Sequence, residues 1–166
     1  MGSEMCIRDR LISDEQFTDN FKTKEFSNSI ARYVLTKIHF HTEGMELIPN
    51  FEAIDLEHIL PQKPSKWLDN GFERDDRRIE SLIYNIGNCT LLNSGGNKKV
   101  GNNLFNYKIP FYKLRDQNNP NGTVFKMTNQ IANDFLSGRL DKWTVTSIFN
   151  RANMFSEHAI KIWQID

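Results

Sequence analysis

Two short apolar segments, well separated in the chain, constrain the fold more than any other feature of the sequence. Residues 51–58 show an imperfect apolar alternation, and Pro61 ends any strand there because proline has no N–H for a sheet ladder. Cys89-Thr-Leu-Leu92 is the second strand candidate. We expect the two segments to pair as a hairpin with a long insertion. Since the other periodic segments have helical spacing, the prediction is an α+β fold, mostly helical around a small hairpin core.

Capping residues and apolar spacing place helices on both sides of the hairpin. Ser13 precedes Phe17 and Phe21, which lie one helical turn apart, so Ser13 is expected to cap a helix. Thr128 is expected to cap a later one, and an interruption is expected near Val100-Gly101. The first expected helix follows Ser13, and the others cover residues 27–40, 75–84, 97–115, 128–135 and 144–163.

The charge balance excludes a chain-wide electrostatic attraction to polyanions. The sequence has 21 Lys and Arg against 21 Asp and Glu, so nucleic-acid binding would have to come from local patches. One candidate patch is the stretch 81–115, which contains no acidic residue. Its basic residues are Lys98, Lys99, Lys108, Lys113 and Arg115.

Cysteine usage and hydropathy narrow the class of protein further. Cys6 and Cys89 show no CxxC spacing, so neither a zinc framework nor a disulfide scaffold is supported. The absence of a disulfide pattern favours a reducing compartment. No window reaches the ~18 apolar residues that a membrane helix needs. We therefore expect a cytoplasmic protein.

Two polar motifs carry the candidate chemistry: Asp55-Leu-Glu-His-Ile-Leu-Pro-Gln62 and Gly87-Asn-Cys-Thr-Leu-Leu-Asn-Ser-Gly-Gly-Asn97. Phosphodiester hydrolysis needs a base for water and a cation for the phosphate. His58, with an ordinary pKa near ~6.5, would be neutral at pH 7 and able to accept a proton. Glu57 and the amide oxygen of Asn97 are hard ligands suited to a magnesium-type ion.

Strand geometry sets a condition on this site. On a regular strand Asp55 and Glu57 share one face, while His58 points to the other. Glu57 and His58 would reach one phosphate only if the strand bends or bulges before Pro61, as strands do beside some active sites.

The combined motifs resemble the HNH nucleases with a ββα-metal site. Glu57-His-Ile-Leu-Pro-Gln62 looks like their acid-His-Ile-x-Pro-Gln signature, and the spacing of Asn88 and Asn97 matches their middle and final amide residues. With Trp67, Phe105, Lys108, Arg151 and Trp163, the pattern is similar to the C-terminal nuclease domain of the GmrSD family of modification-dependent restriction enzymes, over residues 26–163.

The resemblance implies a role for each matching residue. It makes His58 the general base, Asn88 the residue that orients the base and its loop, and Glu57 and Asn97 the metal ligands. Asp55, on the same strand face as Glu57, is a substitute ligand by its position. Because Asn97 replaces a nitrogen ligand that is often histidine, the expected ion is Mg²⁺ or Mn²⁺ and not zinc. Lys98, Lys99 and Lys108 follow the site and are expected to contact DNA phosphates.

The resemblance also implies partners and a domain plan. The expected partner is DNA, possibly with modified bases, and a separate N-terminal nucleotidase and recognition domain would act in cis or in trans. Met5-Cys-Ile-Arg-Asp9 looks like a translated sequencing adapter, so residues 1–10 are expected to be a non-native leader. Residues 11–45 would form a helical flank, and residues 46–166 the HNH-type nuclease domain with C-terminal helices.

Alternative interpretations of the same residues stay open at this point. The fold could be a catalytically inactive DNA-binding or interaction module, or another metal-dependent hydrolase acting on RNA or nucleotides. Glu57 could simply pair with Arg77 or Arg78. Asn93 and Asn97 could serve only as turn residues around Gly95-Gly96.

Overall fold

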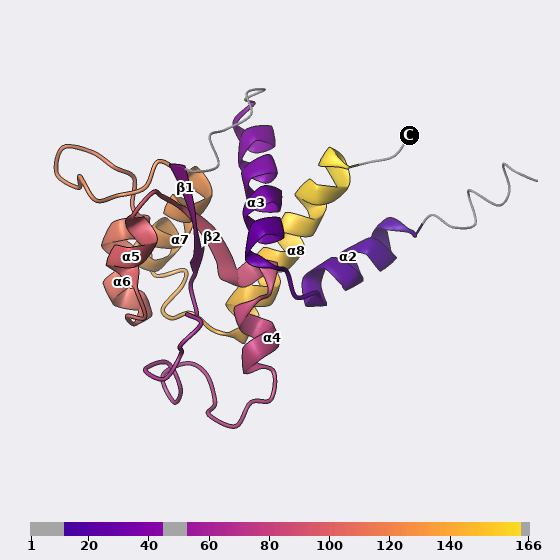
Figure 1. The fold of residues 1–166 in the computed structure, drawn as a ribbon, viewed down its shortest axis with the longest axis horizontal. Helices are drawn as coiled ribbons and strands as arrows, with labels where there is room; N and C mark the ends of the chain where they lie inside the picture. The colour runs from indigo at the N-terminus through magenta and orange to yellow at the C-terminus, as the bar shows by residue number, and fades with distance from the viewer. Residues whose placement is uncertain (1–11, 45–52, 164–166) are drawn as a thin grey trace, which may run out of the picture.

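A two-stranded antiparallel sheet lies at the centre of the protein, with helices on both of its faces (Figure 1). The structure is a computed structural model, and it describes residues 12–44 and 53–163. It is an α+β fold dominated by helices, as the sequence predicts. The elements are α2 (Asp14–Thr23), α3 (Asn28–Glu43), β1 (Ile54–His58), α4 (Ile79–Ile83), the 3-10 turn η2 (Ile86–Asn88), β2 (Cys89–Asn93), α5 (Gly96–Val100), α6 (Phe105–Tyr112), α7 (Lys126–Leu136) and α8 (Val145–Ile162).

The two strands pair in a regular register, which confirms the predicted hairpin with a long insertion. Ile54 faces Asn93 at one end, His58 faces Cys89 at the other, and the pairing is one-to-one between them. Side chains therefore alternate strictly, so Asp55 and Glu57 point to one face and His58 to the other. The bend that the catalytic interpretation called for does not occur within β1.

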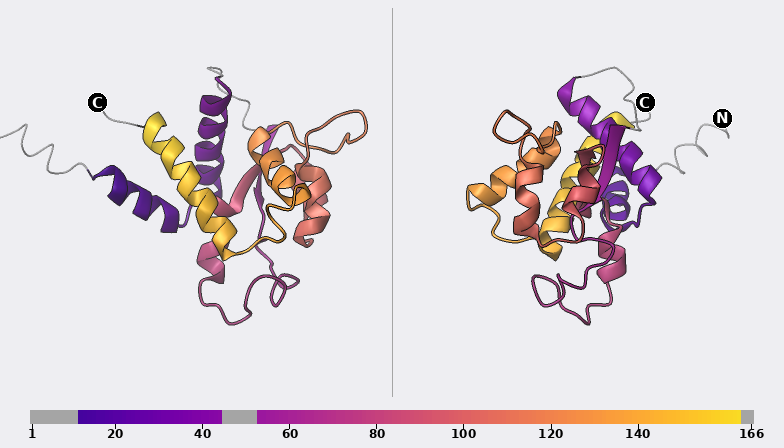
Figure 2. Two further views of the ribbon diagram at one scale, coloured as in Figure 1. Left: turned by 180° about the vertical axis from the view of Figure 1, so that it is seen from behind. Right: turned by 60° about the vertical axis from the view of Figure 1, so that its left-hand side comes forward.

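Each face of the sheet has its own hydrophobic core. On the face of Leu56 and Leu91, a cluster joins the sheet to α2, α3 and α8. On the face of Leu92, a second cluster joins it to α5, α6, α7 and the start of α8. The two helical layers are visible on opposite sides of the strands in both views of Figure 2.

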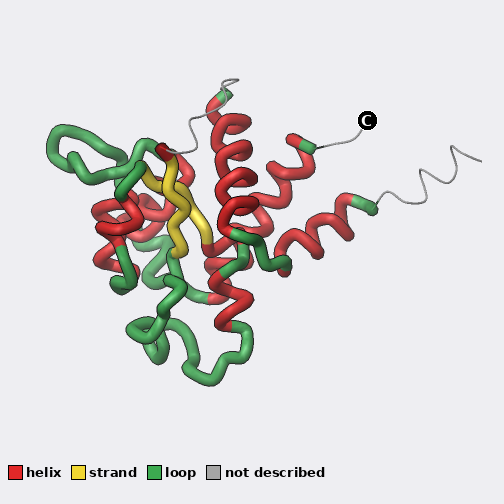
Figure 3. Tube along the Cα trace, in the orientation of Figure 1, coloured by secondary structure: helices red, strands yellow, loops and turns green. Residues whose placement is uncertain are grey.

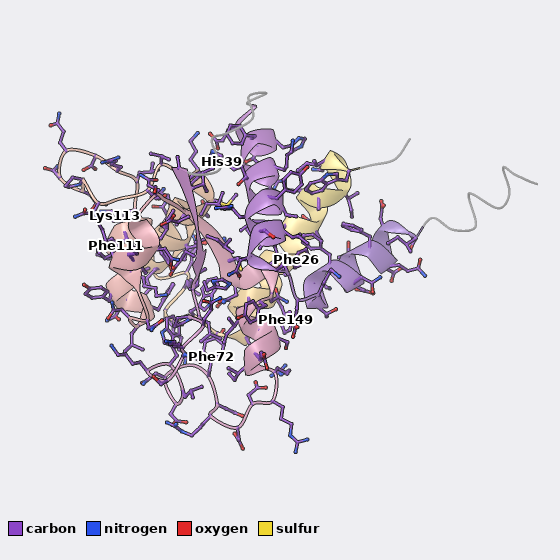
Figure 4. The ribbon with its side chains drawn as sticks, in the orientation of Figure 1. Phe26, His39, Phe72, Phe111, Lys113 and Phe149 are labelled. Atoms are coloured by element: carbon purple, nitrogen blue, oxygen red, sulfur yellow. The ribbon has the colours of Figure 1, made fainter. Side chains whose placement is uncertain are left out.

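The long connection between β1 and α4 is mostly irregular, as the green tube in Figure 3 shows. Two aromatic side chains fasten it to the second core, because Trp67 is 1% and Phe72 is 3% exposed. Phe72 lies within this loop region and Phe26 beside the opposite helical layer in Figure 4. The expected helix over 75–84 is shorter than predicted, because Asp76 bonds Arg78 locally and the helix begins only at Ile79.

Side-chain caps mark the starts of three helices, α2, α3 and α8. Ser13 and Thr144 both form capping boxes, at the starts of α2 and α8. Gly101 separates α5 from α6 with a φ of 54°, at the expected interruption. The prediction for Thr128 is wrong: α7 begins at Lys126, and the Thr128 hydroxyl donates instead to the carbonyl of Leu91, at 2.6 Å.

Among the described residues, no helix has both the length and the apolar character needed to cross a membrane. The expected leader at 1–10 and the expected boundary between residues 45 and 46 lie outside the described residues.

Candidate active site

His58 ends β1 with its imidazole enclosed by protein. The residue is 8% exposed, and its ring packs edge-on against Tyr84 with 5.7 Å between ring centroids. Nε2 is buried and finds no hydrogen-bond partner among the described residues. Burial, and next the charge of Lys108, lower the pKa of His58 from 6.5 to about 4. The ring is therefore neutral at pH 7, with one nitrogen uncommitted.

Asn88 holds the chain directly after this histidine. Its Oδ1 accepts from the Leu60 amide at 2.8 Å and from Trp143 Nε1 at 3.1 Å. Its Nδ2 donates to the carbonyls of Leu60 and Ile83 at 2.9 and 3.0 Å. The side chain is fully buried, and these four hydrogen bonds use both its oxygen and its nitrogen. They connect the residues that follow β1 to Ile83 and Trp143.

Glu57 points to the opposite face of the sheet and is paired with a lysine. Its Oε1 accepts from Lys108 Nζ at 2.7 Å and from the Tyr112 hydroxyl at 2.9 Å. Glu57 is 1% exposed and Lys108 is 0% exposed, so the pair is shielded from solvent. The partner is thus a lysine of α6 and not Arg77 or Arg78.

Lys108 also binds the backbone at the end of β1. Besides Glu57, its Nζ donates to the carbonyls of His58 and Ile59 at 3.2 and 2.8 Å. Burial lowers the pKa of Lys108 and raises that of Glu57, while their mutual contact opposes both shifts. Three acceptors around one nitrogen call for the three donors of an ammonium, so Lys108 is charged and Glu57 is its counter-ion.

The burial of Lys108 corrects its expected role as a DNA-facing residue. A side chain with no exposed surface does not contact a phosphate from the solvent side. Lys98 and Lys99, in contrast, are exposed on α5, and Lys99 Nζ donates to Asn121 at 2.8 Å. Of the basic residues in the stretch 81–115, only those outside α6 are therefore open to a DNA phosphate.

Asp55 and Asn97 come together at the turn after β2. Asp55 Oδ2 accepts from the amides of Gly95 and Asn97, at 2.9 and 3.3 Å. Asn97 itself is exposed, so its side-chain amide is open to solvent. Asp55, proposed from sequence as a substitute ligand, is the carboxylate that lies beside Asn97.

The expected one-metal donor set is not assembled in this arrangement. Glu57 is held by Lys108 on one face, whereas the ring of His58 lies on the other. Along an extended strand the Cα atoms of Asp55 and His58 are about 10 Å apart. No group of three or more His, Cys, Asp or Glu side chains in 12–44 and 53–163 is placed to hold a metal ion. Glu57, His58 and Asn97 therefore do not surround one Mg²⁺ or Mn²⁺ ion in the way that the resemblance implies.

Sequence reasoning missed the residues that surround the site from α6 and α8. Tyr112 lies one helical turn after Lys108, a spacing that places both on one face of α6 and could have marked them as partners. Arg151 of α8 donates to the carbonyls of Gly87 and Cys89 at 2.7 and 2.9 Å, and so holds the start of β2. It was noted only as part of the resemblance, and no local pattern predicts these contacts.

Comparison with known proteins gives one match. The family model described as GmrSD restriction endonucleases, C-terminal domain, matches residues 11–158. Comparisons with curated proteins and with solved structures give no match.

Proposed function

The chain belongs to the family of GmrSD restriction endonuclease C-terminal domains, and from this premise we propose that it is a DNA endonuclease domain with His58 as its general base. The family implies endonuclease activity within a restriction system. The choice of His58 rests on the residues of this chain.

The observation that carries the proposal is the uncommitted nitrogen of His58. A buried polar atom without a partner is unusual in folded proteins and calls for an explanation. The imidazole is neutral at pH 7, the form that accepts a proton, but burial holds its pKa at about 4, below the value of about 7 that suits a general base. Catalysis therefore requires that binding of substrate relieve this burial and raise the pKa. Substrate would reach Nε2 only when the side chains over it, such as Tyr84, move aside.

A divalent ion, Mg²⁺ or Mn²⁺, is proposed as a requirement for cleavage on chemical grounds. When bound, such an ion would neutralise charge on the scissile phosphate. Asn97 and Asp55 are the oxygen-bearing side chains that lie together near the surface. Because Glu57 and His58 point to opposite faces of the sheet, these two side chains would not hold one ion together. Loss of nicking in a chelator, and its recovery with added Mg²⁺ or Mn²⁺, would support the requirement.

Plasmid nicking tests the role of His58. We expect His58→Ala to lower the nicking rate by about 10²–10⁴-fold, the usual contribution of a general base. His158→Ala on α8 is the matched control, because it also removes a histidine with a burial-lowered pKa. Undiminished nicking by His58→Ala, with the control also active, would refute the mechanism.

A catalytically inactive DNA-binding module is the second candidate, and a specific observation favours it. The separation of Glu57 from His58 leaves the expected constellation incomplete. This candidate predicts salt-sensitive DNA binding without cleavage in any divalent metal. Assays on plasmid, single-stranded DNA, RNA and nucleotides would also separate it from a hydrolase with another substrate.

The partners expected from the family resemblance are part of the same proposal. We propose that the substrate is DNA, including DNA with modified bases, and that recognition involves an N-terminal nucleotidase domain in cis or in trans. The expected result is faster cleavage of modified than of unmodified DNA once that domain is added, above the nicking rate of the chain alone.

A further inference from the structure

We propose that Lys108 is a positioning residue for His58, and that Glu57 is the counter-ion of Lys108 and not a metal ligand. The inference rests on the proposed function of His58 as the base. It departs from the roles that the resemblance suggests for both residues, and it follows from the contacts that the two side chains make.

The first step concerns which atoms Lys108 binds. Two of the three acceptors around its Nζ are the carbonyls of His58 and Ile59. At this point β1 ends, and these carbonyls need donors because buried backbone groups are almost always paired. Lys108 therefore binds the two peptide planes on either side of the Ile59 Cα atom, directly after the residue that carries the imidazole.

The second step concerns why a charged residue is used. An ammonium offers three donors at one point, which a hydroxyl or an amide cannot do. Its burial is costly unless an opposite charge lies in contact with it. Glu57 supplies that charge at 2.7 Å, the Tyr112 hydroxyl orients Glu57 at 2.9 Å, and the ring of Trp67 lies 5.5 Å from the ammonium. Glu57 is thus required on the face opposite His58.

The third step concerns the residues directly after β1, which are bound by Asn88 on one side and by Lys108 on the other. The Ile59 amide donates to the carbonyl of Asn88 at 2.9 Å, and the Asn88 side chain bonds both backbone groups of Leu60. Lys108 binds the carbonyl ends of the same two peptide groups whose N–H ends Asn88 binds, because a peptide group is planar. Each group is therefore held at both ends, and we expect loss of the Lys108 anchor to loosen the direction of the imidazole.

The test compares the wild-type chain with the double variant Glu57→Gln/Lys108→Met, which removes both charges and leaves no lone buried ion. Its matched control is Glu43→Gln/Lys126→Met, which removes the other 2.7 Å ion pair, between α3 and α7, where Lys126 is largely exposed. We expect the Glu57/Lys108 double variant to lower kcat for plasmid nicking by about 10–100-fold, the usual effect of a misplaced catalytic group, with KM changed less than threefold. The control should leave both constants unchanged.

An NMR titration of the His58 imidazole reads positioning without any activity. In wild type we expect one set of imidazole signals, and in the Glu57/Lys108 variant several sets. A pKa rise alone does not report positioning, because loss of the Lys108 charge also raises the pKa of His58. If wild type does not nick plasmid, the proposed function fails, while this comparison still decides the positioning role. A single set of imidazole signals in a folded variant would overturn it.

A second variant and a metal-binding measurement complete the test. If the double variant does not fold, Tyr112→Phe removes only the bond that orients Glu57, and a kcat several-fold lower with unchanged KM is expected from it. An unchanged kcat in that variant would count against the network. Mn²⁺ binding, followed by calorimetry, separates the two roles of Glu57. Affinity more than tenfold weaker in the double variant would overturn the counter-ion assignment.

Discussion

The buried imidazole of His58 should make the stability of the protein depend on pH in a defined window. In the folded state its pKa is about 4, whereas the ordinary value for histidine is 6.5. Below pH 6.5 the unfolded chain takes up a proton at this position and the folded chain does not. The free energy of unfolding therefore falls as the pH falls from 6.5 to 4, and His58 contributes no further change below that range.

The size of the effect follows from the two pKa values. At about 1.4 kcal/mol for each pKa unit, His58 should cost about 2 kcal/mol between pH 7 and pH 5, and about 3 kcal/mol by pH 4. Such a loss is a large fraction of the stability of an ordinary domain. It should be measurable as a decrease in the urea midpoint.

Urea unfolding of wild type and His58→Gln, at several pH values between 4 and 7, isolates this contribution. Trp67 and Trp143 are 1% and 2% exposed, so their fluorescence reports loss of the core. Burial also lowers the pKa values of His39 and His158, but those residues are present in both proteins. Equal pH slopes for the two proteins would refute the claim that the folded state keeps His58 neutral.

Three further variants test the supports of the site and its surface. Asn88→Ala leaves several buried groups unpaired and should lower the free energy of unfolding by about 3 kcal/mol or more, measured by urea titration. Gly87→Ala should cost at least ~1–3 kcal/mol in thermal unfolding, because an added Cβ would lie 1.9 Å from the carbonyl oxygen of Ile148 in α8. Replacing both Lys98 and Lys99 by glutamine should weaken DNA binding and reduce its salt dependence by about two charges, as measured by fluorescence anisotropy across salt concentrations.

The sequence by itself determined the elements and the alternation of side chains within them. Capping residues lie within four positions of the groups that they bond, so Ser13 and Thr144 predict the starts of α2 and α8. The period of two along a strand likewise places Asp55 and Glu57 on one face and His58 on the other, whatever covers them. The pairing of β1 with β2 was predicted from the two short strand-like segments, residues 51–58 and 89–92.

Only the tertiary structure decided which of these side chains act together. Lys108 and Glu57 are separated by 51 positions in the chain, and their contact forms because α6 packs over one face of the sheet. Sequence reasoning expected Lys108 to contact DNA phosphates because it follows the two site motifs in a stretch without acidic residues. The fold buries it because the end of β1 leaves two carbonyls that need donors and Glu57 offsets its charge. Local patterns are set by neighbours along the chain, whereas a buried charge depends on partners that the folded chain brings together.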